Sequence, residues 1–173
     1  MFPLFMKTPK KAKRKGLTVQ EHEEHTVSII AAILQHASSQ FRGRVLSKFE
    51  ENEFEKVERL VELHFKYLEK LDEADRSIKM DQDADESLEE DEIYLRRLDS
   101  GLFTLQLIDY IILEVCYSSQ KVKDKLLKLL QLRRGSLDRI KEIVREYAEN
   151  LGDENQEWKL KQQENVEQLI QIS

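Results

Sequence analysis

Two histidines flank a pair of glutamates near the start of the chain, in the order His22, Glu23, Glu24 and His25. Imidazole and carboxylate groups are common zinc ligands, so this segment is the first candidate for a metal site. The metalloprotease pattern His-Glu-x-x-His places its histidines four positions apart on one helix face, and this segment is one residue short. No third ligand is evident nearby, so the segment favours an exposed helix start over a metal site.

His64 and Cys116 are two further side chains that could do chemistry. His64 lies among Leu63, Phe65 and Tyr67, which predicts a packed helix residue with one hydrogen-bonded nitrogen. Cys116 ends an apolar stretch without a neighbouring cation, which favours a buried, inert thiol over a nucleophile. The sequence shows no glycine-rich phosphate loop, no evident Ser/His/Asp arrangement and no cysteine pair for zinc. We therefore predict that the chain is not an enzyme and binds no cofactor or metal.

Asp109 is the most unusual single residue, because it interrupts the almost wholly apolar stretch 102–116. Burying an unpaired carboxylate is costly, so the residue needs an explanation. One interpretation gives it a nearby Arg or Lys partner, or a partly exposed position. The other makes it an acidic contact in a groove that receives a basic peptide. The sequence favours the first interpretation and leaves the second open.

Charge is distributed unevenly along the 173 residues, whose formal net charge is −6. Residues 1–16 carry six basic groups and no acid, which leaves −12 for the rest of the chain. Residues 81–92 carry eight acids and no base, which predicts a solvated, mobile loop. An acidic body favours basic partners and disfavours direct binding of nucleic acid, because phosphates would be repelled.

A basic run within residues 7–15 matches a simple nuclear-localisation pattern. Its candidate residues are Lys10, Lys11, Lys13, Arg14 and Lys15. Short basic runs are common, so three interpretations stay open: a solvated connection between two helices, an importin-binding signal, and an RNA contact. The sequence favours the connection.

The composition indicates an all-α protein. The chain has only 5 glycines and 2 prolines, and 36% of its residues are charged. This mixture suits long exposed helices and argues against a β-sandwich or barrel, which need many turn residues. No uninterrupted apolar stretch reaches the length of about 18 residues that a transmembrane helix requires, so we expect no membrane span.

Apolar residues at helical spacing predict about seven helices. They lie near residues 18–37, 41–49, 54–71, 102–116, 122–130, 137–148 and 156–172. The stretch 102–116 is apolar on all sides, which predicts a buried central helix. Helix starts are expected at Thr18 with Glu21, at Asn52 with Glu55, and at Ser136. Breaks or ends are expected at Gly101, Gly135 and Gly152.

Five segments go beyond helical patterning, at residues 2–7, 21–25, 62–68, 94–103 and 146–152. They include the runs FPLFMK, ELHFKYL and YLRRLDSGLF. Together they resemble the C-terminal part of the beta-catenin-like family, nuclear armadillo-repeat proteins of the splicing machinery. The order and spacing of five segments make this resemblance far more specific than any one segment, and it covers essentially the whole chain.

The resemblance implies an armadillo-like helical superhelix, with armadillo-type repeats over residues 1–118 and a C-terminal helical cap over 119–173. It implies a nuclear, non-enzymatic scaffold of the NineTeen-type complex of the spliceosome. Its expected partners are splicing proteins with basic nuclear-localisation segments, such as the cell-division-cycle-5-like protein, and in vertebrates activation-induced deaminase. The family's peptide-binding groove lies largely in upstream repeats, so we expect this chain to be the terminal piece of a longer protein.

Two alternatives to this function remain. The chain could be a helical module that contacts RNA or an importin through the basic segment 7–15. It could also be a coiled-coil dimerisation piece built on residues 53–80 and 156–172, although sustained heptads are not evident.

Overall fold

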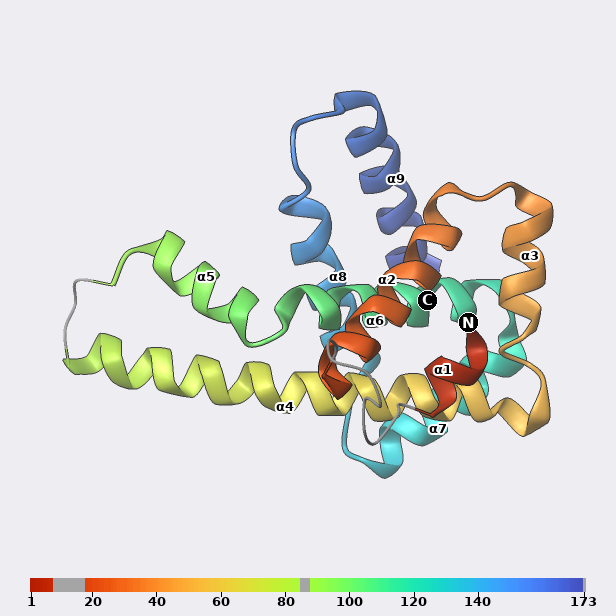
Figure 1. Ribbon diagram of the computed structural model, residues 1–173, viewed down its shortest axis with the longest axis horizontal. Coiled ribbons are helices and arrows are strands. Elements are labelled where there is room, and N and C mark those ends of the chain that lie inside the picture. The colour runs from red at the N-terminus through yellow and green to blue at the C-terminus, as the bar shows by residue number, and fades with distance from the viewer. Residues whose placement is uncertain (8–17, 85–87, 173) are drawn as a thin grey trace.

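The computed structural model describes residues 1–7, 18–84 and 88–172 (Figure 1). Every regular element within these residues is a helix, which confirms the all-α prediction. In chain order the elements are α1 (Phe2–Met6), α2 (Val19–His36), α3 (Ser39–Ser47), the short 3-10 helix η1 (Asn52–Phe54), α4 (Glu55–Ala84), α5 (Glu90–Asp99), α6 (Leu102–Ser118), α7 (Gln120–Leu132), α8 (Leu137–Glu149) and α9 (Gln156–Ile172).

Helix α6 forms the centre of the molecule (Figure 1). Between Leu102 and Cys116, every side chain is buried except that of Phe103. The helix packs against α2, α4, α7, α8 and α9. A helix that is apolar on all sides buries the most surface when neighbours surround it, so the prediction of a central helix is confirmed.

Gly101 forms the bend between α5 and α6. Its φ of +104° lies in the left-handed region, which a glycine adopts without steric cost. The predicted break is confirmed, and the two helix axes differ by 69°. Across the described part of the chain, no single helix is long and apolar enough to cross a membrane; α5 and α6 reach that length and composition only together, as this bent pair.

Two helix starts follow the predicted capping residues. The Thr18 hydroxyl accepts a hydrogen bond from the Glu21 N–H at 3.2 Å, and the Glu21 carboxylate accepts one from the Thr18 N–H at 2.5 Å. This reciprocal capping box satisfies N–H groups that the first turn of α2 leaves without a helical partner. At the start of α8, the Ser136 hydroxyl accepts a hydrogen bond from the Arg139 N–H at 3.2 Å. Both capping predictions are confirmed.

The structure departs from the sequence-based expectation at Asn52 and at Gly152. Asn52 begins η1, a 3-10 helix of three residues that all have positive φ, and its side chain donates to the Glu55 carboxylate at 2.7 Å. Helix α8 ends before Asn150, whose side chain donates to the Glu146 carbonyl at 2.9 Å. Gly152 therefore lies beyond the end of α8, and its assignment as the helix stop was wrong.

Most of the acidic segment 81–92 is helical, so the prediction of a loop over this whole segment was wrong. Helix α4 runs into the segment and α5 begins within it, while residues 85–87 lie outside the described part. The physical reason lies in Arg96. Its guanidinium is 2.6 Å from Asp81 of α4 and 2.8 Å from Glu92 of its own helix, which offsets repulsion among the carboxylates.

The second half of α4 and all of α5 run side by side and project from the body as an arm (Figure 1). With 30 residues, α4 is about 45 Å long, so one continuous helix belongs to both body and arm. Arg97 fixes the base of the arm, because its guanidinium lies 3.0 Å from Asp75 of α4 and 2.5 Å from Glu146 of α8.

One hydrophobic core spans the predicted boundary between residues 118 and 119. Val122 of α7, Val144 of α8 and Leu169 of α9 belong to the same buried cluster as the side chains of α6. The division into armadillo-type repeats and a C-terminal cap stays a prediction. In the structure, both parts pack against α6 and share one core.

Candidate functional site

Asp109 lies in the core and pairs with His64. Its side chain is 0% exposed, and its Oδ1 atom is 2.5 Å from Nδ1 of His64, which is 1% exposed. Burial raises the pKa of the Asp109 carboxyl, while the neighbouring His64 and Arg139 act in the opposite direction. The packed histidine is confirmed. The groove contact proposed for Asp109 was wrong, because a fully buried carboxyl cannot meet a peptide; its partner is a histidine and not the expected Arg or Lys.

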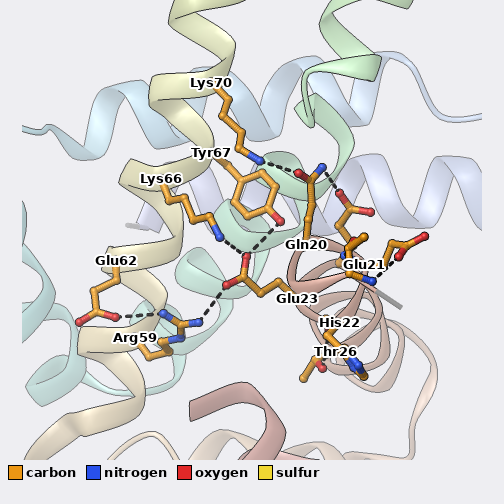
Figure 2. A network of polar contacts seen from close by, with 12 residues as sticks. Gln20, Glu21, His22, Glu23, Thr26, Arg59, Glu62, Lys66, Tyr67 and Lys70 are labelled. Carbon is orange, nitrogen blue, oxygen red and sulfur yellow. Dashed lines mark hydrogen bonds and ion pairs between the residues drawn. The ribbon is translucent and has the colours of Figure 1, made fainter. Parts of the chain in front are cut away.

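The His22–His25 segment forms the first turns of α2, and its most important residue is Glu23 (Figure 2). His25 is exposed, as expected for a helix start, but Glu23 is only 7% exposed. Among the residues that the structure describes, no three His, Cys, Asp or Glu side chains are placed to hold a metal ion. The segment therefore contributes a buried carboxylate to a helix contact.

Glu23 joins α2 to α4 through cations on α4. Its Oε2 atom is 2.5 Å from Nζ of Lys66, and its Oε1 atom is 3.2 Å from Nη2 of Arg59 (Figure 2). The Tyr67 hydroxyl lies 3.4 Å from the same carboxylate, and burial together with the charge of Glu23 raises the pKa of this tyrosine. A carboxylate between two cations can be buried without remaining unpaired, so this contact fixes the two helices relative to each other.

A polar cluster further along α6 plays a similar part between α6, α3 and α9. Glu114 is 0% exposed and forms an ion pair with Arg42 of α3. It also accepts a hydrogen bond from the Tyr110 hydroxyl at 2.5 Å, and Asn165 of α9 lies 3.4 Å away. Burial raises the pKa of Tyr110, so this hydroxyl remains a donor at neutral pH.

The contacts of Glu23 and Glu114 were not predicted from the sequence, although the position of Glu23 on its helix gave an indication. Glu23 falls on the same helical face as Val27 and Ile30, which are 0% exposed. An acid on the apolar face of a helix needs a partner, but the sequence alone does not show which helix supplies it.

Cys116 is 4% exposed, and burial raises the pKa of its thiol to about 12. This confirms the prediction of a buried thiol. The basic residues Lys10, Lys11, Lys13, Arg14 and Lys15 lie outside the described residues, so the three interpretations of that segment stay predictions.

The end of the arm, formed by the described residues between 77 and 96, is an exposed acidic surface. Its carboxylates are all exposed; we call them the acidic tip: Asp81, Asp83, Glu89, Glu90, Asp91 and Glu92. The bases within the same described stretch are Lys79 and Arg96. Met80, 73% exposed, and Leu95, 60% exposed, add apolar area beside the charges. This surface suits a partner that offers positive charge together with aliphatic stems.

Comparison with known proteins gives a consistent set of relatives. The family described as "Catenin-beta-like, Arm-motif containing nuclear" matches residues 1–145. Beta-catenin-like protein 1 of Bos taurus is 46% identical over 162 residues, and that of Homo sapiens is 45% identical over 161 residues; each alignment covers 88% of this chain. The beta-catenin-like protein 1 homolog of Schizosaccharomyces pombe is 29% identical over 130 residues, 74% of this chain. The chain spans about 29% of the length of the two mammalian proteins, in their C-terminal part.

Proposed function

The chain belongs to the catenin-beta-like family of nuclear Arm-motif proteins, and we propose that it is a non-enzymatic protein-binding scaffold in pre-mRNA splicing. The proposed setting is the NineTeen-type complex of the spliceosome, in the nucleus. The proposed partners are splicing proteins with basic nuclear-localisation segments, of which the cell-division-cycle-5-like protein is the example that the family resemblance supplies. The observation that carries this proposal is the acidic tip of the α4–α5 arm.

The proposed mechanism combines charge with shape. Carboxylates of the acidic tip attract a Lys- and Arg-rich segment, which raises the rate of encounter and disfavours acidic competitors. The aliphatic stems of bound lysines and arginines would then cover Met80 and Leu95, which are exposed beside the charges. Since the attraction acts between exposed groups, it weakens as salt screens the charges.

The buried ionisable groups have a structural role in the core. Glu23, Asp109 and Glu114 each face a partner on another helix, so these carboxylates hold helices together within the described fold. This leaves the exposed surface to carry the proposed function.

A charge-neutralising variant tests the acidic tip. The triple substitution Asp83→Asn, Glu90→Gln and Asp91→Asn removes three exposed carboxylates of the tip. A matched control, Glu157→Gln, Glu164→Gln and Glu167→Gln, removes the same charge from exposed positions of α9. Binding of a synthetic Lys/Arg-rich nuclear-localisation peptide is measured by calorimetry at low and high salt.

We expect the tip variant to weaken peptide binding about tenfold, and the α9 variant to change it less than about twofold. Equal weakening by both variants would mean that net charge alone attracts the peptide. Absence of salt-sensitive binding by the unaltered chain would contradict the proposal. A pull-down from nuclear extract with both variants, read by mass spectrometry, tests whether splicing proteins depend on the same residues.

A further inference from the structure

A groove of about 420 Å³ lies where the body meets the arm, and its lining includes Tyr94 of α5, two residues from Glu92 of the acidic tip. Helix α2 and the first turns of α6 supply part of its lining, and the end of α8 with the start of α9 supplies most of the rest. We call it the aromatic groove, after the rings of His36, Phe103, Tyr147 and Trp158. No Asp, Glu, Lys or Arg is among the described residues that line it. Its volume falls in the range of ligand-binding clefts, about 300–1,000 Å³.

The rings form two pairs contributed by four helices. Phe103 of α6 and Tyr147 of α8 have ring centroids 6.5 Å apart, and Phe103 is 51% exposed. His36 of α2 and Trp158 of α9 are stacked, with centroids 5.8 Å apart and planes inclined by 18°. Phe103 is the exposed exception on a helix that is otherwise buried to Cys116, so its ring is available to a ligand.

Small side chains in the lining leave room for a ligand backbone. The groove is also lined by Ala31 and Ala32 of α2 and by Gly152 after α8. A chain entering between the rings can therefore approach the protein backbone closely. A groove lined by flat aromatic surfaces and small residues favours an extended segment over a bulky helix.

Gln106 is a buried polar residue in the groove lining whose amide is unpaired within the described part of the chain. It is 2% exposed and lines the groove, and its Nε2 atom has no hydrogen-bond partner among the described residues. Buried polar groups in proteins are nearly always paired, so an unpaired amide in a groove calls for an acceptor. A carbonyl oxygen of a bound peptide would be that acceptor once the Gln106 side chain turns its amide toward the groove, because an amide N–H₂ donates.

We propose that the aromatic groove binds an extended, uncharged, proline-containing segment of a partner protein. Proline carries no N–H that would remain unsatisfied against apolar walls, and its ring packs on aromatic faces. A polyproline II segment keeps its carbonyls solvated and free to accept a bond from Gln106. A basic segment finds no carboxylate in this groove, so the groove and the acidic tip take partners of different chemistry.

Trp158 reports on this groove directly, because it is the chain's single tryptophan. The 173-residue chain is titrated with the neutral peptide Pro-Pro-Leu-Pro-Pro-Leu-Pro-Pro, and with a counterpart that has alanine at every proline position. We expect a saturable change in tryptophan emission, with the proline peptide binding at least about tenfold more tightly. No saturable change, or equal binding of the alanine peptide, would each overturn the proposal.

Two exposed phenylalanines give a matched pair of variants. Phe103→Ala removes a ring of the groove, whereas Phe41→Ala removes a ring of similar exposure, 48%, from α3. We expect Phe103→Ala to weaken binding of the proline peptide about tenfold and Phe41→Ala to leave it within about twofold. Equal effects of the two variants would overturn the proposal.

Gln106→Leu separates binding from folding. We expect this variant to melt at the same or a higher temperature, because it removes an unpaired buried amide, while its affinity for the proline peptide falls about fivefold to tenfold. Unchanged affinity in a folded variant would count against the carbonyl contact. Light scattering tests the competing occupant, a second copy of the chain: self-association that Phe103→Ala abolishes would overturn the proposal.

The aromatic groove and the acidic tip can be tested independently of each other. The tip variant should leave the proline peptide's affinity unchanged, and Phe103→Ala should leave the basic peptide's affinity unchanged. If the tip variant weakens the proline peptide as well, the assignment of separate partners is wrong.

Discussion

Tyr67 of α4 lies against the backbone of Gly101, so closely that a Cβ atom at Gly101 would meet Cδ1 of the tyrosine ring at 2.9 Å. Tyr67 is itself 0% exposed and cannot move aside. Gly101 also has a φ of +104°, which side chains rarely adopt. Both facts require glycine at the bend where the arm meets the central helix.

The substitution Gly101→Ala should therefore lower the free energy of unfolding by about 1–3 kcal/mol, since it adds a clash to an unfavourable backbone conformation. The control is Gly43→Ala in α3, where an added Cβ meets nothing within 4 Å. We expect that control to be neutral or stabilising by up to about 1 kcal/mol. Urea unfolding followed by circular dichroism measures both, and a Gly101→Ala variant as stable as the original chain would contradict the steric argument.

Glu23→Gln should destabilise the chain by about 2 kcal/mol, because it removes the negative charge that lies between Arg59 and Lys66. The effect is smaller than for a fully buried pair, since Lys66 is 39% exposed. Glu62→Gln is the control: it also loses an ion pair with Arg59, but its side chain is 62% exposed. We expect a change below about 0.5 kcal/mol there. Similar losses for the two variants in chemical unfolding would show that burial of Glu23 does not matter.

Cys116 should resist alkylation in the folded chain. Burial raises the pKa of its thiol to about 12, so at pH 8 the group is both protonated and sheltered. We expect iodoacetamide to label it at least about 100-fold more slowly in the folded chain than in urea, as measured by mass spectrometry. A chain with Cys116→Ser and Tyr117→Cys is the control, because position 117 is 48% exposed and should label rapidly.

The raised pKa of the Cys116 thiol also predicts that the free energy of unfolding depends on pH. Because its pKa is raised on folding, its contribution to stability is fully present below the unfolded value of about 8.5 and is lost as pH rises toward 12. Unfolding free energies of the original chain and Cys116→Ser, compared at pH 8 and pH 10, should converge as pH rises. A difference that stays constant would contradict this.

Asp109→Asn should reveal titration of the buried Asp109 carboxyl. Burial raises the pKa of Asp109, so its contribution to stability is present below the ordinary carboxyl pKa, near 4, and is lost as pH rises through the folded value. The unfolding free energy of the original chain minus that of Asp109→Asn should therefore fall as pH increases above about 4. Asp153, whose pKa is held low by a hydrogen bond from Lys159, should show the opposite sign in Asp153→Asn. A pH-independent difference for Asp109→Asn would contradict the raised pKa.

The predictions that proved correct depend on patterns within short stretches of the sequence. The capping box at Thr18 and the cap at Ser136 depend on residues three positions apart, so the sequence contains the whole interaction. The central helix 102–116 was predictable because an all-apolar helix has only one stable environment. The order of five segments supplied the family, which physical patterning alone would not have identified.

Contacts between distant residues could not be predicted. Asp109 and His64 each stood out in the sequence, yet they are 45 positions apart and meet only once α4 packs on α6. Similarly, Arg96 lies 15 positions from Asp81, so an acidic stretch that indicated a loop became the ends of two helices. The aromatic groove draws on several helices, and no local spacing brings its rings together.

Helix α6 has a practical consequence for work with shorter pieces of this protein. A cut after Ser118 would remove α7, α8 and α9, which cover part of its surface. The truncated product would expose a large apolar surface to water, and such surfaces drive aggregation. Proteolytic nicks tolerated by this fold should therefore fall at exposed connections such as residues 153–155, whereas expression of either half alone should yield insoluble material.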